Sequence, residues 1–312
     1  MVLFKKSKSL VFLFLTLMLS ALSLYSGETK GLVEILKKKK NEGKRPRIAL
    51  VCGGGGAKGI AHVGVLRELE RAGIHPDLIV GCSSGALIGA LYAADPNINK
   101  LENLLIKVKC SEFFDFSFLS PRFGFMKANQ MKRFLKLHMQ HDDFAKLKIP
   151  LIITATDLIS GETIEMSEGG VINALLASSA VPLIFKPVKY QGRLLVDGGV
   201  SNPIPVDVAK KHGAQIIIAV DVSAQLSTYG ASHLFGIAKR SLEICYRELA
   251  DRVVKDADVV IRMEFKDIGM FSHKKNFQIY DQGRKMTRKA LPSIRKCIAE
   301  TMSDHSQSPN GN

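Results

Sequence analysis

Two short apolar segments, each followed by a glycine-containing turn and then a helical pattern, constrain the fold of this chain most strongly. The first, 48–51, runs into the glycine-rich turn Gly53–Gly59 and a predicted helix over 60–72. The second, 78–80, runs into Gly81-Cys82-Ser83-Ser84-Gly85 and an Ala/Leu-rich helix. Strand–turn–helix units in tandem are typical of a mostly parallel sheet with helices on both faces. We therefore expect an α/β fold.

The same rhythm continues through most of the chain. Further apolar runs at 151–156, 194–196 and 216–220 predict more strands, and a last helix is expected over about 277–298. No repeat and no linker divides residues 46–300, which we interpret as one domain followed by a polar tail over 301–312.

The N-terminus carries a different pattern. Lysines precede an apolar run of sixteen residues, 10–25, which is typical of a signal peptide over 1–26 and short for a membrane span. Export to the periplasm or the medium follows from that interpretation. The basic linker 27–45 disfavours transfer across a membrane, so an uncleaved N-terminal membrane anchor stays open as an alternative.

The charge balance indicates which partners to expect. Lys and Arg number 44 against 29 Asp and Glu, which gives a net charge of +15. Such a chain attracts anions, either nucleic acid or an anionic membrane surface. With no Trp, six Tyr and no recognisable motif, nucleic-acid binding is disfavoured. The five Cys lie far apart, so we expect no metal site. The oligomeric state is not predicted.

Gly81-x-Ser83-x-Gly85, between a strand and a helix, has the pattern of a nucleophile elbow. The flanking glycines let strand and helix approach, and the serine hydroxyl stands at the positive end of the following helix. The five-residue pattern alone is weak and also fits an ordinary tight turn. Ser84 is outside the apex of the elbow, and we expect it only to fill space.

The earlier turn contains Gly54, Gly55, Gly56, Lys58 and Gly59. Its Gly-x-Gly-x-x-Gly spacing fits a dinucleotide site, but the acid at the right distance, Asp77, precedes its strand instead of ending it. The alternative is an oxyanion hole, in which unhindered backbone N–H groups meet the negative oxygen of a tetrahedral intermediate. For Lys58 we favour a structural role in the loop.

A serine nucleophile needs a base, and Asp197-Gly198-Gly199 follows a predicted strand. Some burial would raise the basicity of this carboxylate. Asp157 and Asp221 also end strands and serve as controls. None of the eight histidines lies in a comparable turn, and His62, inside a helix, is interpreted as a packed residue.

These three motifs, in this order, resemble the patatin-like phospholipase family over about 46–298, and specifically its bacterial branch related to neuropathy target esterase. The resemblance implies a three-layer α/β/α domain with a Ser–Asp dyad and no cofactor. Carried over to this chain, Ser83 is the nucleophile, Asp197 the base, and Gly55 and Gly56 supply oxyanion N–H groups. The implied reaction is hydrolysis of fatty-acyl esters of phospholipids or lysophospholipids through an acyl-serine intermediate.

A segment rich in Phe and Met, 113–139, separates the elbow from the next strand. It is interpreted either as core or as an acyl-chain pocket facing an anionic lipid surface. Two other function classes stay open: a noncatalytic lipid-binding protein with the same fold, and a nucleotide-binding protein that uses the Gly-x-Gly-x-x-Gly loop.

Overall fold

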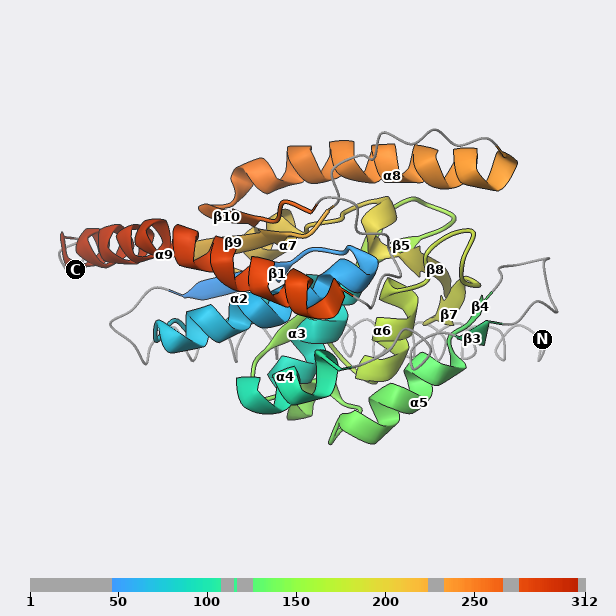
Figure 1. The fold of residues 1–312 in the computed structure, drawn as a ribbon, viewed down its shortest axis with the longest axis horizontal. Coiled ribbons are helices and arrows are strands. Elements are labelled where there is room, and N and C mark those ends of the chain that lie inside the picture. Colours follow the sequence, from blue (N-terminus) through green and yellow to red (C-terminus); the bar gives the residue numbers. More distant parts are fainter. Residues whose placement is uncertain (1–46, 108–114, 117–125, 224–232, 266–274, 308–312) are drawn as a thin grey trace, which may run out of the picture. The chain divides into compact units, whose positions relative to one another are not determined.

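The computed structural model describes residues 47–107, 115–116, 126–223, 233–265 and 275–307, which belong to one compact unit spanning 45–312 (Figure 1). The predicted signal peptide or anchor over 1–26 and the basic linker 27–45 lie outside the described residues. Within the described residues, no helix combines the length and apolar character needed to cross a membrane.

A mixed, mostly parallel sheet forms the centre of the unit. Its strands run in the order β10-β9-β1-β2-β5-β8-β7, and β6 pairs with β5. Neighbouring strands from β10 to β5 are parallel, whereas β6, β8 and β7 pair antiparallel. The bounds are β1 Ile48–Cys52, β2 Leu78–Cys82, β5 Leu151–Asp157, β6 Thr163–Met166, β7 Val188–Tyr190, β8 Arg193–Asp197, β9 Ile216–Asp221 and β10 Val259–Arg262.

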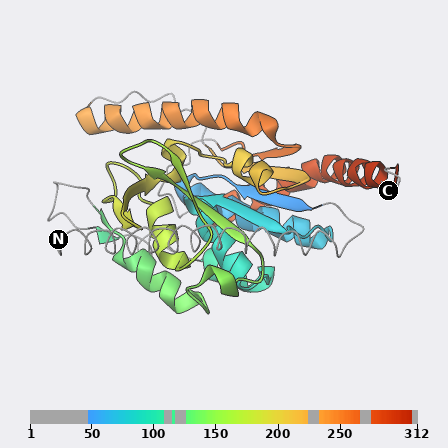
Figure 2. The ribbon, with the colours of Figure 1, turned by 180° about the vertical axis from the view of Figure 1, so that it is seen from behind.

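Helices cover both faces of the sheet, as the sequence predicts. From β1 through α2 (Ile60–Arg71) to β2, and through α3 (Ser84–Ala94) to β5, the sheet grows in one direction. From β8 through α7 (Val206–Lys211) to β9, and through α8 (Leu234–Val253) to β10, it grows in the other. Because crossovers between parallel strands are right-handed, α8 lies on the face opposite α2 and α3. Figures 1 and 2 show α8 and α3 on opposite sides of the sheet.

Burial on both faces explains why the central strands are apolar without alternation. All residues of β1, β2, β5 and β9 are buried. The main helix–helix contact is between α2 and α9 (Asn276–Gln307), where glycines permit close approach. A Cβ atom at Gly64 would lie 2.2 Å from the carbonyl oxygen of Tyr280, and one at Gly283 would lie 2.1 Å from that of Ala61.

The structure differs from the sequence-based prediction at several helices. Helix α9 extends to Gln307, into the predicted polar tail, where residues such as Glu300 and Met302 favour helix. Helix α6 spans Val171–Ser178. Helix α8 was not predicted at all. Two further helices and six short elements complete the described part of the chain. They are α4 Ile98–Leu105, β3 Asp115–Phe116, β4 Met126–Lys127, α5 Asn129–His138 and the 3₁₀ turns η1 Gly56–Gly59, η3 Phe144–Lys146, η4 Gly198–Val200 and η5 Val254–Asp256.

The Phe/Met segment is only partly described. Met131, Phe134 and Met139 are buried in the main core, which favours the packing interpretation for this part. The phenylalanines at 113, 114, 118, 123 and 125 lie outside the described residues. Of the five cysteines, Cys52, Cys82, Cys245 and Cys297 are described, and all four are unpaired thiols.

Candidate active site

Ser83 occupies the sharp turn between β2 and α3. Its backbone has φ 52° and ψ −122°, a conformation that is rare for a residue other than glycine and marks a strained turn. The flanking glycines make the turn feasible, because a Cβ atom at Gly81 would lie 2.5 Å from Cα of Ala86, and one at Gly85 would lie 2.2 Å from the carbonyl oxygen of Cys52. The N–H of Ser83 donates to Oγ of Ser178 at 2.8 Å. The nucleophile elbow predicted from the sequence is thus present as a backbone conformation.

Asp197 reaches Ser83 because of the strand register around β5. On one side of β5, Thr154 pairs with Cys82, the residue before the serine. On the other side, the antiparallel β8 ends with Asp197 opposite Ala155, the next residue along β5. The two predicted catalytic residues therefore emerge from strands on either side of β5 at almost the same height. A Cβ atom at Gly198 would lie 2.5 Å from the carbonyl oxygen of Thr154, so the turn after Asp197 requires glycine.

The carboxyl of Asp197 is buried and only partly satisfied. Its Oδ1 accepts the N–H of Gly199 at 2.8 Å, whereas Oδ2 has no hydrogen-bond partner among the described residues. Burial raises the pKa of Asp197 to about 6, and the nearby Ser83 hydroxyl and the Gly199 N–H lower it. The Ser83 hydroxyl thus acts on this carboxyl, although Oδ2 accepts no hydrogen bond from it. A partly desolvated carboxylate beside a serine hydroxyl has the basicity and position to accept its proton.

The glycine loop lies next to the serine. A Cβ atom at Gly54 would lie 3.1 Å from Cβ of Ser83. The N–H of Gly54 donates to the carbonyl oxygen of Pro203 at 3.1 Å, and the N–H of Gly55 donates to Oγ of Ser84 at 3.0 Å. Gly56 opens η1, and the first N–H groups of a helix have no acceptor within that helix. The N–H of Gly56 therefore has no acceptor within η1, whereas the N–H of Gly55 would have to leave Ser84 before it could bind an oxyanion.

One expectation about this loop changes. Ser84 does more than fill space, since it accepts the Gly55 hydrogen bond, and Gly59 is required because a Cβ atom there would lie 2.6 Å from Cβ of Ser84. Lys58 is buried, and burial lowers the pKa of its amine to about 8. The charges that act on this amine are Glu243 and Lys239 of α8, which fits the structural role that we favoured.

His62 and the two control aspartates, Asp157 and Asp221, have other partners than Ser83. His62 is buried with a ring nitrogen 2.8 Å from the carbonyl oxygen of Gly53, and burial lowers its pKa to about 4. Asp157 accepts the Ile159 N–H and pairs with Arg193 at 2.8 Å, contacts that lower its pKa. Asp221 has no exposed surface and pairs with Arg262 at 2.9 Å. Asp197, in contrast, is the strand-end aspartate whose carboxyl lies beside the Ser83 hydroxyl, and this hydroxyl lowers its pKa.

Sequence reasoning missed two residues that contact the site. Ser178, which accepts the Ser83 N–H, lies at the end of helix α6; residues 177–182 resemble the family in sequence, but this role was not predicted. Tyr246 of α8 donates to the carbonyl oxygen of Gly54 at 2.5 Å from a helix that was not predicted. Within the described part of the chain, no three His, Cys, Asp or Glu side chains are grouped in a way that would hold a metal ion.

A comparison with family models matches residues 50–210 to "Patatin-like phospholipase", which is more than half of the chain and includes the elbow, the glycine loop and Asp197. The chain belongs to the patatin-like phospholipase family. The resemblance based on the three motifs is thereby confirmed. Helix α8 lies beyond the matched residues.

Relatives within this family are identical to this chain at about a third of the aligned residues. Patatin-like phospholipase domain-containing protein 6 of Mus musculus is 33% identical over 197 residues, which cover 59% of this chain and 14% of the mouse protein. A lysophospholipase of Scheffersomyces stipitis is 34% identical over 184 residues, 57% of this chain and 12% of that protein. An uncharacterized NTE family protein of Mycobacterium tuberculosis is 31% identical over 182 residues, 57% of this chain and 49% of that protein. The alignments thus span half or less of each relative.

Among solved structures, VipD from Legionella pneumophila superposes with a TM-score of 0.55 over 80% of this chain and 67% of that chain. The sequence identity is 12%, so this similarity concerns the fold alone. It agrees with the three-layer α/β/α architecture expected for a patatin-like domain.

Proposed function

We propose that this chain is a serine acyl hydrolase that cleaves fatty-acyl esters of phospholipids or lysophospholipids. The observation that carries the proposal is the pairing of a strained Ser83 with the buried, partly unsatisfied carboxyl of Asp197. Membership of the patatin-like phospholipase family supports the ester-hydrolase class. The relative named a lysophospholipase supports the choice of substrate.

The geometry supports a two-step reaction. Asp197 accepts the proton of the Ser83 hydroxyl while Oγ attacks the ester carbonyl. The negative oxygen of the intermediate is stabilised by the Gly56 N–H and by the N-terminus of α3, and each well-placed donor contributes about 3–4 kcal/mol. The alcohol leaves with the proton from Asp197. Water, deprotonated by Asp197, then attacks the acyl-serine. The fatty acid is released as Asp197 returns the proton to Oγ of Ser83.

A raised pKa suits this role. An exposed aspartate with a pKa near 4 is a weak base, whereas a carboxyl with a pKa of about 6 binds a proton about a hundredfold more tightly and is still ionised at pH 7. Burial therefore increases the basicity of Asp197 without leaving it protonated at neutral pH.

The nucleotide-binding alternative has less support. The carboxylate of Asp77 accepts the N–H of Ile48 at 2.9 Å, at the amino end of β1. This is the opposite end of the strand from the glycine loop, where a dinucleotide would need the acid. A noncatalytic lipid-binding protein would have the same fold, so only a measurement of hydrolysis distinguishes this alternative from an enzyme.

We further propose that an anionic membrane surface is a partner. The net charge of +15 supports attraction to anionic lipid. Helix α8 adds apolar contact, because Leu234, Ile237 and Ile244 are 85%, 52% and 41% exposed. Its charged residues Lys239 and Glu243 lie half-buried and ion-paired at 3.7 Å. Export by a signal peptide, or anchoring by an uncleaved one, remains our proposal for localisation on the basis of residues 1–26.

The test of the proposed function uses the full chain with lysophosphatidylcholine and with a soluble ester, 4-nitrophenyl octanoate. Wild type should release fatty acid from both substrates, and Ser83→Ala should release it from neither. Binding of lysophospholipid without hydrolysis would favour the noncatalytic alternative, and bound NAD in the purified protein would favour the nucleotide-binding one.

A further inference from the structure

Helix α8, which lies outside the residues matched by the family model, contacts the candidate active site through Tyr246. Part of the tyrosine is exposed, but its hydroxyl is buried and donates to the carbonyl oxygen of Gly54 at 2.5 Å. Burial, together with the nearby Cys82, Asp197 and Asp221, raises the pKa of this hydroxyl well above its usual value. Tyr246 is therefore a neutral hydrogen-bond donor at every pH at which the enzyme would work.

The acceptor of this hydrogen bond is part of the oxyanion loop. The carbonyl of Gly54 and the N–H of Gly55 belong to one planar peptide group and point in opposite directions. Tyr246 holds the carbonyl end, and Oγ of Ser84 holds the N–H end at 3.0 Å. Glycine has the widest choice of backbone angles, so an unheld run of glycines would sample many orientations. The two contacts fix the Gly54–Gly55 peptide, which adjoins the peptide that carries the N–H of Gly56, the oxyanion donor of the proposed reaction.

The ring of the same tyrosine contacts the second catalytic turn. A Cβ atom at Gly199 would lie 2.3 Å from Cε2 of Tyr246, so ring and turn are in direct contact and only glycine fits there. The N–H of Gly199 is the group that holds Oδ1 of Asp197 at 2.8 Å. One side chain thus packs against both the oxyanion loop and the turn that orients the proposed base.

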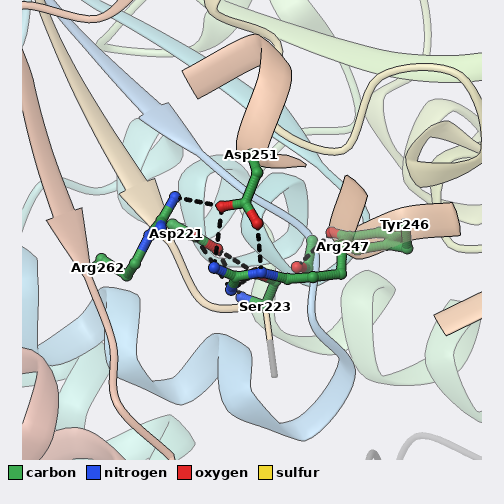
Figure 3. Close-up of polar contacts among 7 residues, drawn as sticks. Asp221, Ser223, Tyr246, Arg247, Asp251 and Arg262 are labelled. Carbon is green, nitrogen blue, oxygen red and sulfur yellow. Dashed lines mark hydrogen bonds and ion pairs between the residues drawn. The ribbon is translucent and has the colours of Figure 1, made fainter. Parts of the chain in front are cut away.

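An ion-pair network fixes the position of α8 at this point (Figure 3). Arg247, next to Tyr246, donates to Oγ of Ser223 and to Asp251, both at 2.9 Å. Arg262 of β10 pairs with Asp251 at 2.7 Å and with the buried Asp221 at 2.9 Å. Because the network joins α8 to the ends of β9 and β10, it limits rotation of the helix about its axis. Such rotation would withdraw the tyrosine from the loop.

We propose that Tyr246 is a positioning residue for the proposed ester hydrolysis: through its hydroxyl it sets the peptide plane that precedes the oxyanion donor, and through its ring it supports the turn of Asp197. The inference rests on the proposed function. Tyr246 does not touch the reacting atoms, so it acts by orienting groups that are needed in the transition state, and its loss should lower kcat more than it changes KM.

The test compares Tyr246→Phe with wild type on 4-nitrophenyl octanoate. The substitution keeps the ring on Gly199 and removes only the donor to Gly54. Active sites are counted by titration with a fluorophosphonate, so that any loss of folded protein is removed from kcat. We expect kcat per titrated site to fall by about 10- to 100-fold, as for a small misplacement of a catalytic group, with KM changed by less than about threefold.

Tyr280→Phe is the matched control, because Tyr280 donates an equally short hydrogen bond, 2.5 Å, to Glu102 away from the site. It should leave kcat within about twofold of wild type. A Tyr246→Phe variant with wild-type kcat per titrated site, or one that changes KM alone, overturns the inference. Should that variant not fold, Ser84→Ala releases the other end of the same peptide, and an unchanged kcat per site there overturns it equally. Absence of any Ser83-dependent hydrolysis by wild type would instead overturn the proposed function.

Discussion

Ser83 and Asp197 lie beside one another because the strands that carry them flank the same central strand, with Cys82 opposite Thr154 and Asp197 opposite Ala155. The antiparallel direction of β8 is essential to this arrangement. If β8 ran parallel to β5, Asp197 would lie at the other end of β8, about one strand length away from Ser83. The site therefore depends on the one part of the sheet that departs from the parallel pattern.

The pH dependence of activity tests the environment of Asp197. Its carboxyl must be ionised to accept a proton, and burial raises its pKa to about 6. We expect kcat/KM on a soluble ester to be constant above that value and to fall about tenfold per pH unit below it. Rates from pH 4.5 to 8 give the profile. Activity that stays constant down to pH 4.5 would mean that the base is an ordinary exposed carboxylate or a different group.

Asp197→Asn separates catalysis from stability. The change removes the proton acceptor, so kcat should fall by about 10²–10⁴-fold. The pKa of this carboxyl is 3.8 in the unfolded chain and about 6 in the folded chain. The ionised carboxylate therefore destabilises the folded state. This destabilisation is complete above pH 6 and vanishes below pH 3.8. At pH 8 the free energy of unfolding of the Asn variant should therefore exceed that of wild type by up to about 3 kcal/mol, and the variant should unfold at a higher temperature.

The stability difference should shrink as the pH is lowered toward 4, where wild-type Asp197 is protonated in the folded state. Thermal unfolding at both pH values measures this. A variant that is less stable than wild type at pH 8 would show that the carboxylate is paired rather than merely buried. Asp157→Asn is the control, since the pKa of that residue is lowered and its loss should destabilise the fold at pH 8.

The adjacent serines should behave differently. Ser83→Ala should abolish ester hydrolysis with the fold intact, because a small side chain fits the elbow. Ser84→Ala removes the acceptor of the Gly55 N–H and should lower kcat by about tenfold without abolishing it. Circular dichroism and kinetics on both variants provide the measurement. If Ser84 proved essential and Ser83 dispensable, the register of the proposed elbow would be wrong.

Membrane binding should depend on the outer face of α8. Replacing Leu234, Ile237 and Ile244 together by Ser should lower partitioning to vesicles containing phosphatidylglycerol by about tenfold or more, because apolar contact is lost. Hydrolysis of a soluble ester should be unchanged. Because charge attraction is screened over about 8 Å at physiological salt, binding by wild type should also weaken as salt rises.

Matched controls are available elsewhere on the surface. Leu137 and Ile159 are 77% and 83% exposed but lie on α5 and in the turn after β5. Replacing both by Ser should leave vesicle binding unchanged. Equal losses in the two sets, or equal binding of wild type to neutral and anionic vesicles at low salt, would contradict a specific role for α8.

Much of the architecture can be predicted from the sequence because the central strands are uninterrupted apolar segments. Strands β1, β2, β5 and β9 are buried on both faces, so each is an uninterrupted apolar run that ends in a recognisable turn. The strain at Ser83 also follows from the sequence, because glycines at 81 and 85 indicate a sharp turn from strand to helix in which a Cβ atom at either position would clash.

Helix α8 was not predicted because its polar face packs on the protein and its apolar face is exposed. An ordinary surface helix turns its apolar stripe toward the core. In α8, charged and polar residues such as Arg247 and Tyr246 contact the body of the protein, Leu234 and Ile237 face outward, and Ala250 is its one buried residue within the described part. Periodicity therefore gave no sign of a packed helix, and its contact with Gly54, 192 positions away along the chain, has no local signal.

The most direct test of the central claim is to locate the nucleophile by chemistry. The full chain is treated with a fluorophosphonate, digested with a protease and analysed by mass spectrometry. We expect one adduct per chain, on Ser83, with no labelling of Ser83→Ala and with markedly slower labelling of Asp197→Asn. An adduct on a different residue, or labelling of Ser83→Ala at the wild-type rate, would contradict the assignment of Ser83 as the nucleophile activated by Asp197.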